Sequence, residues 1–348
     1  MISLCMIVKN EELNLSKCLS NIKGWVDEII IVDTGSTDKT KEIAKQYTDK
    51  IFDFKWCDDF AKVRNFSISM AKNDWVLILD ADEVVSFFNK KTVNKFIVTN
   101  EKLVGRIKRI NTFENADGEK RLLERVNRLF NKKYFKYAGI IHEQIVAINE
   151  EKYNTLDIDI EADHIGYEKV VLERTNKINR NKVLLRKAIT KEVNDPYLYY
   201  QLGKTFFMEK DYIKAEENFQ TAINIGVKAK YEYVEDLIES YGYTLINLKK
   251  YKEALMLKSY EDIYKDNPDF SFVMGLIYMN NAKFDEAIAK FKQCQNGKGS
   301  KIEGVNSYSA NYNIGVIYEC LEKHKKAVEY YKKCGSYNLA LKRLRVIN

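Results

Sequence analysis

Short apolar runs alternate with stretches of helical periodicity over the first half of the chain. The runs lie at 2–8, 28–33, 51–56 and 75–79. Between them, as at 11–22 and 59–72, apolar positions recur every three or four residues. Mainly apolar strands that alternate with helices are typical of a parallel sheet covered on both faces. Residues 1–165 are therefore predicted to form an α/β domain.

From about residue 195 the apolar positions follow the period of a helical repeat. Four times a glycine is followed twelve residues later by an alanine, with apolar or aromatic residues around both. The pairs are Gly203/Ala215, Gly242/Ala254, Gly275/Ala287 and Gly315/Ala327. Small residues allow paired helices to approach closely, and aromatic residues fill the space between them. The spacing predicts about four tetratricopeptide repeats with a capping helix.

The change of period divides the chain into an α/β domain at 1–165, a linker helix at 166–194 and an all-α solenoid at 195–348. Charge follows a similar division, because residues 1–165 carry a net charge of −1 and residues 166–348 a net charge of +8. The basic excess of the second half fits either solvated helix faces or a surface for an acidic or flexible partner.

Composition excludes several classes of protein. With 45% hydrophobic residues among 348, the chain is not disordered, and a net charge of +7 is small for a nucleic-acid clamp. The first apolar run is too short for a signal peptide or a membrane span. The six cysteines have no metal-type spacing and are expected to be reduced, buried thiols. These features predict a cytoplasmic protein.

Polar clusters follow three of the predicted strands directly. They are KNEE at 9–12, DTGS at 33–36 and DADE at 80–83. Ligands of open α/β sheets bind at the carboxyl ends of the strands, so these clusters should converge. The chain has neither a GxGxxG nor a GxxxxGK[ST] motif. Acidic residues beside an anionic ligand need a cation between them, and Mn²⁺ or Mg²⁺ on a diphosphate meets that need.

Four motifs, in this order, resemble those of family 2 glycosyltransferases of the GT-A fold. They are SLCMIVKNEE at 3–12, VDTGSTD at 32–38, WCDDFA followed by Arg64-Asn65 at 56–65, and LDADE at 79–83. With the repeats added, the chain resembles the sublancin-type peptide S-glycosyltransferases and related bacterial enzymes. The resemblance implies a nucleotide-diphospho-sugar transferase fold with a Rossmann-like mixed sheet, and a metal-dependent, inverting transfer from a UDP-sugar.

The resemblance also implies roles for the nucleotide-sugar-binding residues. Asp33 would hold the uracil or the ribose, with Lys9 and Glu11 beside the base. Arg64 would lie near the phosphates.

Asp80-Ala81-Asp82 would be the DxD motif, in which Asp80 faces the ribose and Asp82 binds the metal. A helix N-terminus enriched in acids is the structural alternative for this segment.

The acid–base residue is not given by a matching family motif. An inverting transferase needs a group that takes the acceptor's proton, and the usual aspartate motif has no counterpart here. His142-Glu143 and His164 lie in one short region of the α/β half. Glu143 is our candidate general base, and His164 our candidate second metal ligand. Core or surface histidines remain the alternative.

The stretch 102–136 holds 11 Lys and Arg residues against four acids. Its basic residues alternate, as at Arg106, Lys108, Arg125 and Arg128, so they share strand faces. This pattern fits a solvated sheet face, a wall beside the diphosphate, or a track for the acceptor.

The sequence thus predicts an enzyme that moves a sugar, from UDP-glucose or a UDP-N-acetylhexosamine, to a peptide or protein acceptor. The solenoid would bind the acceptor or mediate a homodimer. One alternative acceptor is a cell-surface saccharide or lipid-linked glycan, with the solenoid used for assembly. Another alternative is a repeat-based scaffold with an inactive transferase domain. Neither nucleic acid nor a membrane span is expected.

Overall fold

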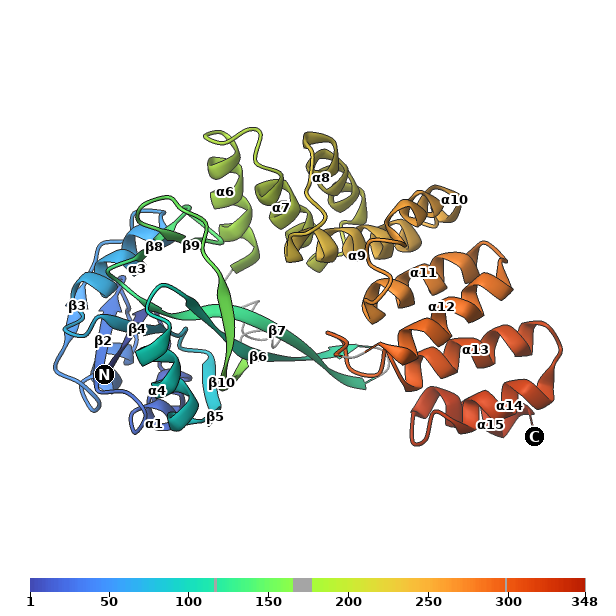
Figure 1. Cartoon of the computed structure of the whole chain (residues 1–348), viewed down its shortest axis with the longest axis horizontal. Coiled ribbons are helices and arrows are strands. Elements are labelled where there is room, and N and C mark those ends of the chain that lie inside the picture. Colours follow the sequence, from blue (N-terminus) through green and yellow to red (C-terminus); the bar gives the residue numbers. More distant parts are fainter. Residues whose placement is uncertain (116–117, 165–176, 298, 348) are drawn as a thin grey trace. The chain divides into compact units, whose positions relative to one another are not determined.

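A computed structural model describes residues 1–115, 118–164, 177–297 and 299–347 (Figure 1). The chain divides into two compact units, Met1–Phe113 with Leu122–Leu184, and Glu114–Arg121 with Leu185–Asn348. The first unit is built on a sheet, and the second is mainly helical. The predicted order, an α/β domain followed by an all-α solenoid, is confirmed. Among the described residues, no helix combines the length and apolar character needed to cross a membrane.

The described strands of the first unit form an eight-stranded mixed sheet in the order β3-β2-β1-β4-β7-β6-β10-β5. These strands are β1 (Ile2–Val8), β2 (Glu28–Asp33), β3 (Ile51–Asp53), β4 (Trp75–Ile78), β5 (Glu83–Phe88), β6 (Val104–Asn115), β7 (Gly118–Asn131) and β10 (Thr155–His164). The pairings among β3, β2, β1 and β4 are parallel, as the apolar runs predict. β7 pairs antiparallel with β4, and β5 pairs antiparallel with β10. The carboxyl ends of β2, β1 and β4 therefore lie along one edge.

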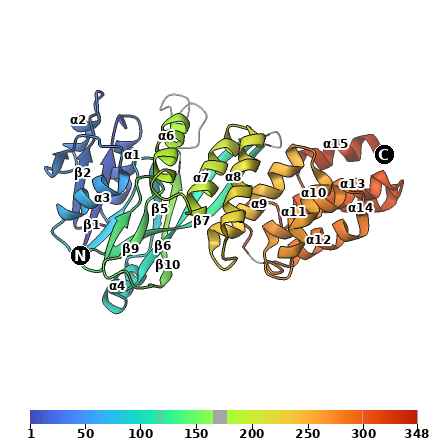
Figure 2. The same cartoon turned by 90° about the horizontal axis from the view of Figure 1, so that it is seen from above.

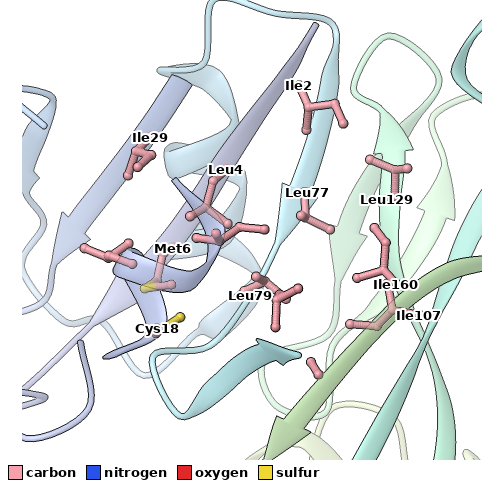
Figure 3. Close-up of a cluster of buried hydrophobic side chains, with 14 of the residues drawn as sticks. Ile2, Leu4, Met6, Cys18, Ile29, Leu77, Leu79, Ile107, Leu129 and Ile160 are labelled. Carbon is pink, nitrogen blue, oxygen red and sulfur yellow. The ribbon is translucent and has the colours of Figure 1, made fainter. Parts of the chain in front are cut away.

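Both faces of this sheet are covered. One apolar core joins alternate residues of β1 to helices α1 (Leu15–Ile22) and α4 (Lys90–Thr99). Figure 3 shows part of it, with Leu4 and Met6 of β1 beside Leu77 and Cys18. The other core joins the opposite face to helix α3 (Phe60–Ser69) and to a two-stranded sheet. That small sheet pairs β8 (Phe135–Ala138) with β9 (Gln144–Ala147). A short helix, α2 (Thr40–Ala44), follows β2.

The second unit stacks helix pairs in chain order (Figure 2). After α6 (Lys177–Ile189), which spans the boundary between the units, its helices are α7 (Pro196–Met208), α8 (Tyr212–Ile225), α9 (Glu232–Asn247), α10 (Tyr251–Ala254), α11 (Pro268–Asn280), α12 (Phe284–Asn296), α13 (Tyr308–Cys320), α14 (His324–Lys332) and α15 (Asn338–Ile347). The two prolines open α7 and α11, where a missing N–H costs nothing. The second repeat departs from the expected pair, because α10 is one turn long and continues as a 3₁₀-helix, η1 (Leu255–Tyr260).

The repeat glycines lie where a helix and its partner touch. A Cβ atom on Gly203 would lie 2.5 Å from the ring of Phe219, and Gly275 faces Phe291 in the same way at 2.6 Å. Gly315 faces Tyr331 at 2.5 Å. The close approach inferred from the Gly–Ala spacing is confirmed at these three repeats. A Cβ atom on Gly242 would lie 2.5 Å from Val273 of α11 and 3.2 Å from Leu257 of η1, so the closer contact is with a later helix.

Gly315→Ala is expected to destabilise the second unit by about 1–3 kcal/mol, although alanine favours a helix by about 1 kcal/mol over glycine. The ring of Tyr331 is fully buried and its hydroxyl donates to Glu319 at 2.6 Å, so it cannot move aside freely. Urea unfolding followed by circular dichroism at 222 nm measures the change. Gly24→Ala, whose Cβ would meet no atom within 4 Å, should leave that transition in place. An unshifted Gly315→Ala curve would contradict the packing argument.

Candidate active site

The loops that follow β1 and β2 are tied together by side chains. The Asn10 backbone has a positive φ of 56°, its N–H donates to Ser36 Oγ at 2.9 Å, and its side-chain oxygen accepts from the Thr37 N–H at 2.8 Å. The Glu11 N–H donates to Thr40 Oγ1 at 2.7 Å. Lys9 is exposed beside them. The KNEE and DTGS clusters thus form one rim at the carboxyl edge of the sheet.

Asp33 presents an unused acceptor inside this rim. Gly35 has a φ of 101°, a conformation open to glycine, and it turns the chain back after β2. The turn lets Asp33 Oδ1 accept the N–H groups of Gly35 and Ser36, both at 2.9 Å. The residue is 1% exposed, and its Oδ2 has no hydrogen-bond partner within the described part of the chain. A buried acceptor without a partner is suited to a ligand N–H or O–H donor.

Asp80 is held by two buried arginines. Arg64 of α3 donates from Nη2 to Asp80 Oδ1 at 2.8 Å and also bonds Glu143 through Nε. Arg128 of β7 donates to Asp80 Oδ2 at 3.0 Å and to Glu83 Oε1 at 2.5 Å. Burial opposes ionisation of Asp80, but the charges of Arg64 and Arg128 outweigh it and hold its pKa well below the ordinary value. Three predicted residues, Arg64, Asp80 and Glu143, therefore lie in one ion-pair cluster.

Several donors in this cluster have no partner within the described ranges. They are Nη1 of Arg64, Nε of Arg128 and the hydroxyl of Tyr137, all buried. The Tyr137 ring lies 5.6 Å from the Arg64 guanidinium carbon. Burial raises the pKa of Tyr137 to about 12, so its hydroxyl stays protonated. Unused buried donors suit an anionic ligand.

Asp82 lies beside His164, as a metal pair would require. The Asp82 side chain is 7% exposed, and its Oδ2 is 3.4 Å from His164 Nε2. Lys177 Nζ is 3.0 Å from the same oxygen. Burial opposes ionisation of Asp82, but the hydrogen bond and charge of His164, with the charge of Lys177, lower its pKa to about 2. Burial raises the pKa of Glu11 as well, and the negative charges of Asp82 and Asp80 add to that rise.

A side-chain relay orients the His164 ring. Asn111 donates its amide NH₂ to Glu124 Oε2 at 2.6 Å, so its amide oxygen is the atom 2.6 Å from His164 Nδ1. Nδ1 therefore donates to Asn111, and Nε2 faces Asp82. Arg109 holds Glu124 at 2.8 and 3.2 Å. A histidine fixed in this way is typical of metal ligands, whose second nitrogen is hydrogen-bonded to a neighbour.

The donor set fits a divalent cation that is shared with a ligand. Within the described ranges, no group of three or more His, Cys, Asp or Glu side chains is arranged to hold a metal alone. A carboxylate and an imidazole, Asp82 and His164, nevertheless converge. Mg²⁺ and Mn²⁺ take oxygen ligands readily, and Mg²⁺ commonly binds through one or two carboxylates plus substrate phosphates and water.

His142 differs from the other histidines. It has a φ of 48°, and its Nε2 is buried with no partner in the described residues. Burial lowers the pKa of His142 to about 4, against the charge of Glu143, so the ring is neutral at pH 7. Glu143, the candidate base, is 10% exposed and directly bonded to Arg64. The structure brings Glu143 near Asp80, since both carboxylates contact Arg64.

The basic stretch 102–136 serves two purposes. Arg106 and Arg125 pair with Asp157 of β10 at 2.8 and 3.3 Å, which is sheet-face pairing. Arg109 and Arg128 turn to Glu83, the fully buried first residue of β5. Neither Glu83 nor Asn111 was predicted as a site residue, and Lys177 lies in the segment predicted as a linker helix. The alternation of basic residues was the sequence feature that pointed to the arginines near Asp80.

Residues 3–152 match the sequence model of Glycosyl transferase family 2, and residues 308–339 match a tetratricopeptide repeat. The chain carries a family 2 glycosyltransferase domain followed by tetratricopeptide repeats. All of the predicted site residues except His164 lie within the matched part of the glycosyltransferase domain.

Relatives of the chain include a repeat protein and a glycosyltransferase. It is 29% identical over 233 residues to a TPR repeat-containing protein of Synechococcus elongatus, covering 65% of this chain and 57% of that one. It is 28% identical over 211 residues to the SPbeta prophage-derived glycosyltransferase SunS of Bacillus subtilis, covering 59% and 49%. The chain spans about half the length of the curated relatives it matches. Among solved structures, YrrB, a TPR protein with an unusual peptide-binding site, aligns at a TM-score of 0.42 and 24% identity, covering 51% and 88%.

Proposed function

We propose that the chain transfers a sugar from a UDP-sugar to a peptide or protein acceptor, with Mn²⁺ or Mg²⁺ held by Asp82 and His164. One observation carries the proposal. In a family 2 glycosyltransferase domain, Arg64, Asp80 and Glu143 form one cluster beside the Asp82–His164 pair. Unused buried donors and an unused buried acceptor lie in the same part of the fold.

Different side chains bind different parts of the donor. Asp33 Oδ2 accepts from the base or the ribose, and Lys9 and Glu11 flank that region. Arg64, with its unused Nη1, faces the phosphates and stabilises the charge that grows on the leaving group. A bound divalent cation would add positive charge at the diphosphate, which lowers the barrier to its departure.

Glu143 takes the proton of the acceptor in this scheme. Its ion pair with Arg64 fixes the carboxylate in position before the acceptor arrives. Proton transfer to a carboxylate positioned within hydrogen-bond reach contributes about 10²–10⁴-fold to a rate. Attack on the sugar from the side opposite the leaving group inverts its configuration.

The repeats are proposed to hold the acceptor. Stacked helix pairs form extended surfaces that suit extended peptides. Within the second unit, a cavity of about 340 Å³ is lined by polar and aromatic side chains that include Glu235, Tyr264, Asp269 and Lys301. Such a lining offers hydrogen bonds and one apolar ring face to a peptide.

Release of UDP tests the donor half of this proposal. We expect the full chain with Mn²⁺ to release UDP from UDP-glucose or a UDP-N-acetylhexosamine, slowly to water and faster with the true acceptor. Chelation by EDTA should stop the release, and added Mn²⁺ should restore it. Asp82 is negatively charged, so it needs a cation between it and the diphosphate. A chain that neither binds UDP nor releases it from any common UDP-sugar would refute the function.

A further inference from the structure

Lys177, the first described residue of α6, already places a cation on the proposed metal ligand. Its Nζ is 3.0 Å from Asp82 Oδ2, and that oxygen also faces His164 Nε2 at 3.4 Å. The Lys177 side chain is 25% exposed, whereas that of Asp82 is 7% exposed. The ammonium group thus reaches a nearly buried carboxylate from the solvent side.

The start of α6 faces the acidic cluster with a second cation. Arg180 lies one helical turn after Lys177, and residues three apart share a helix face. Its guanidinium lies 5.2 Å from the centre of the Phe60 ring, at the first residue of α3. Its charge interacts with those of Glu143, Asp80 and Glu11.

A bound metal ion and the Lys177 ammonium group cannot both contact Asp82 Oδ2 at the same time. A metal ion bound between Asp82 and His164 takes the oxygen that Lys177 now contacts, and like charges at such a distance repel each other. Lys177 must then withdraw. Lysine has a flexible four-carbon stem and carries a compact charge that also binds phosphate oxygens. A diphosphate on the metal would give the displaced ammonium a new partner nearby.

We propose that Lys177 exchanges between Asp82 and the donor's diphosphate, so that it opposes binding of the metal alone and favours binding of metal and nucleotide together. This inference rests on the proposed function, because it uses the same metal pair and the same diphosphate. It assigns the segment expected to be a linker helix to the donor site. It also makes metal and nucleotide binding mutually dependent, since each relieves a cost of the other.

Lys177→Met separates the two effects, since it removes the charge but keeps most of the stem. We expect Mn²⁺ alone to bind about tenfold tighter to this variant, because a competing cation is gone. We expect UDP in saturating Mn²⁺ to bind about tenfold weaker, because one phosphate partner is gone. Electron paramagnetic resonance of free Mn²⁺ measures the first affinity, and titration calorimetry with UDP measures the second.

Two controls use the same full-length chain. Lys191→Met removes an exposed lysine charge just beyond α6 and should change neither affinity. Lys177→Arg keeps the positive charge and should stay close to wild type in both measurements.

Opposite shifts in the two affinities support the exchange, because simple damage to the site would weaken both. If the wild type binds UDP and Lys177→Met shows any other pattern, the exchange is refuted. If the wild type binds no UDP, the proposed function fails instead, while the affinity for Mn²⁺ alone still reports whether Lys177 competes.

Discussion

Asp82→Asn is expected to lower the rate of sugar transfer about 1,000-fold, because metal charge on a leaving diphosphate contributes several kcal/mol to the transition state. The substitution keeps the size of the side chain and one oxygen, but it removes the negative charge that faces His164 and Lys177. Affinity for Mn²⁺ should fall together with activity. Steady-state assays with a UDP-sugar, run beside Mn²⁺ titrations, measure both losses.

Asp163→Asn is the matched control. Asp163 is exposed and precedes His164 on β10, and successive strand residues point to opposite faces. This variant should transfer sugar like the wild type. If Asp82→Asn kept more than about a tenth of the wild-type rate in Mn²⁺, the metal role of Asp82 would be wrong, since one lost metal ligand costs far more. Retained circular dichroism would show that the fold of the variant is intact.

The sequence predicted the carboxyl edge of the sheet because strand periodicity and strand ends are local signals. Asp33, Asp80 and the KNEE segment each follow an apolar run directly, and parallel pairing then brings them to one edge. Glu143 and His164 come from the later, β-rich part of the domain, where the pattern fixed neither pairing nor register. Their approach to Arg64 and Asp82 appears only in the fold.

Other site residues carried no local signal at all. Asn111 meets His164 because β6 pairs with β10 in a register that places the two residues side by side. Lys177 meets Asp82 across 95 residues of sequence. A lysine at the start of a helix is ordinary in sequence, and only its position against a buried carboxylate gives it a role.

The repeats show the same limit in another form. The Gly–Ala spacing correctly located close contacts at Gly203, Gly275 and Gly315, because each contact is made within one helix pair. Gly242 keeps the spacing and lies near Leu257 of its own repeat, but its closest contact is Val273 of the later helix α11. The spacing therefore identifies the small residues of each repeat. The residue that contacts each glycine depends on the helix that forms next to it.

Lys301→Met is expected to destabilise the second unit by about 3 kcal/mol at pH 8, where the Glu239 carboxyl ionises and pairs with the lysine. Lys301 Nζ lies 2.6 Å from Glu235 and 3.2 Å from both oxygens of Glu239, which is 6% exposed. Removing one partner of a buried ion pair costs about 3–5 kcal/mol, and the lower value applies because 28% of the lysine side chain is exposed. Asp236 and Asp269 add negative charge around Glu239, which increases the cost of losing the lysine.

The loss should grow as the pH rises. Burial raises the pKa of Glu239 to about 8, although Lys301 lowers it, against an ordinary value of 4.5. Between these values the folded chain keeps a proton that the unfolded chain has released, so this group weakens stability as pH increases. Without Lys301 the carboxylate has lost its main counter-charge. The loss of stability in Lys301→Met, relative to wild type, should therefore be larger at pH 8 than at pH 5. Adding Glu239→Gln should recover much of it.

Two spectroscopic probes keep this result specific to the repeats. All three tryptophans, Trp25, Trp56 and Trp75, lie in the first unit, so their fluorescence follows the unfolding of the glycosyltransferase domain. Circular dichroism at 222 nm follows mainly the helices of the second unit. Lys301→Met should shift the dichroism transition and leave the fluorescence transition in place, whereas Lys292→Met, at an exposed site on α12, should shift neither. Equal dichroism midpoints for Lys301→Met and wild type at pH 8 would show that the lysine does not stabilise this acidic cluster, because an uncompensated buried carboxylate cannot be neutral in cost there.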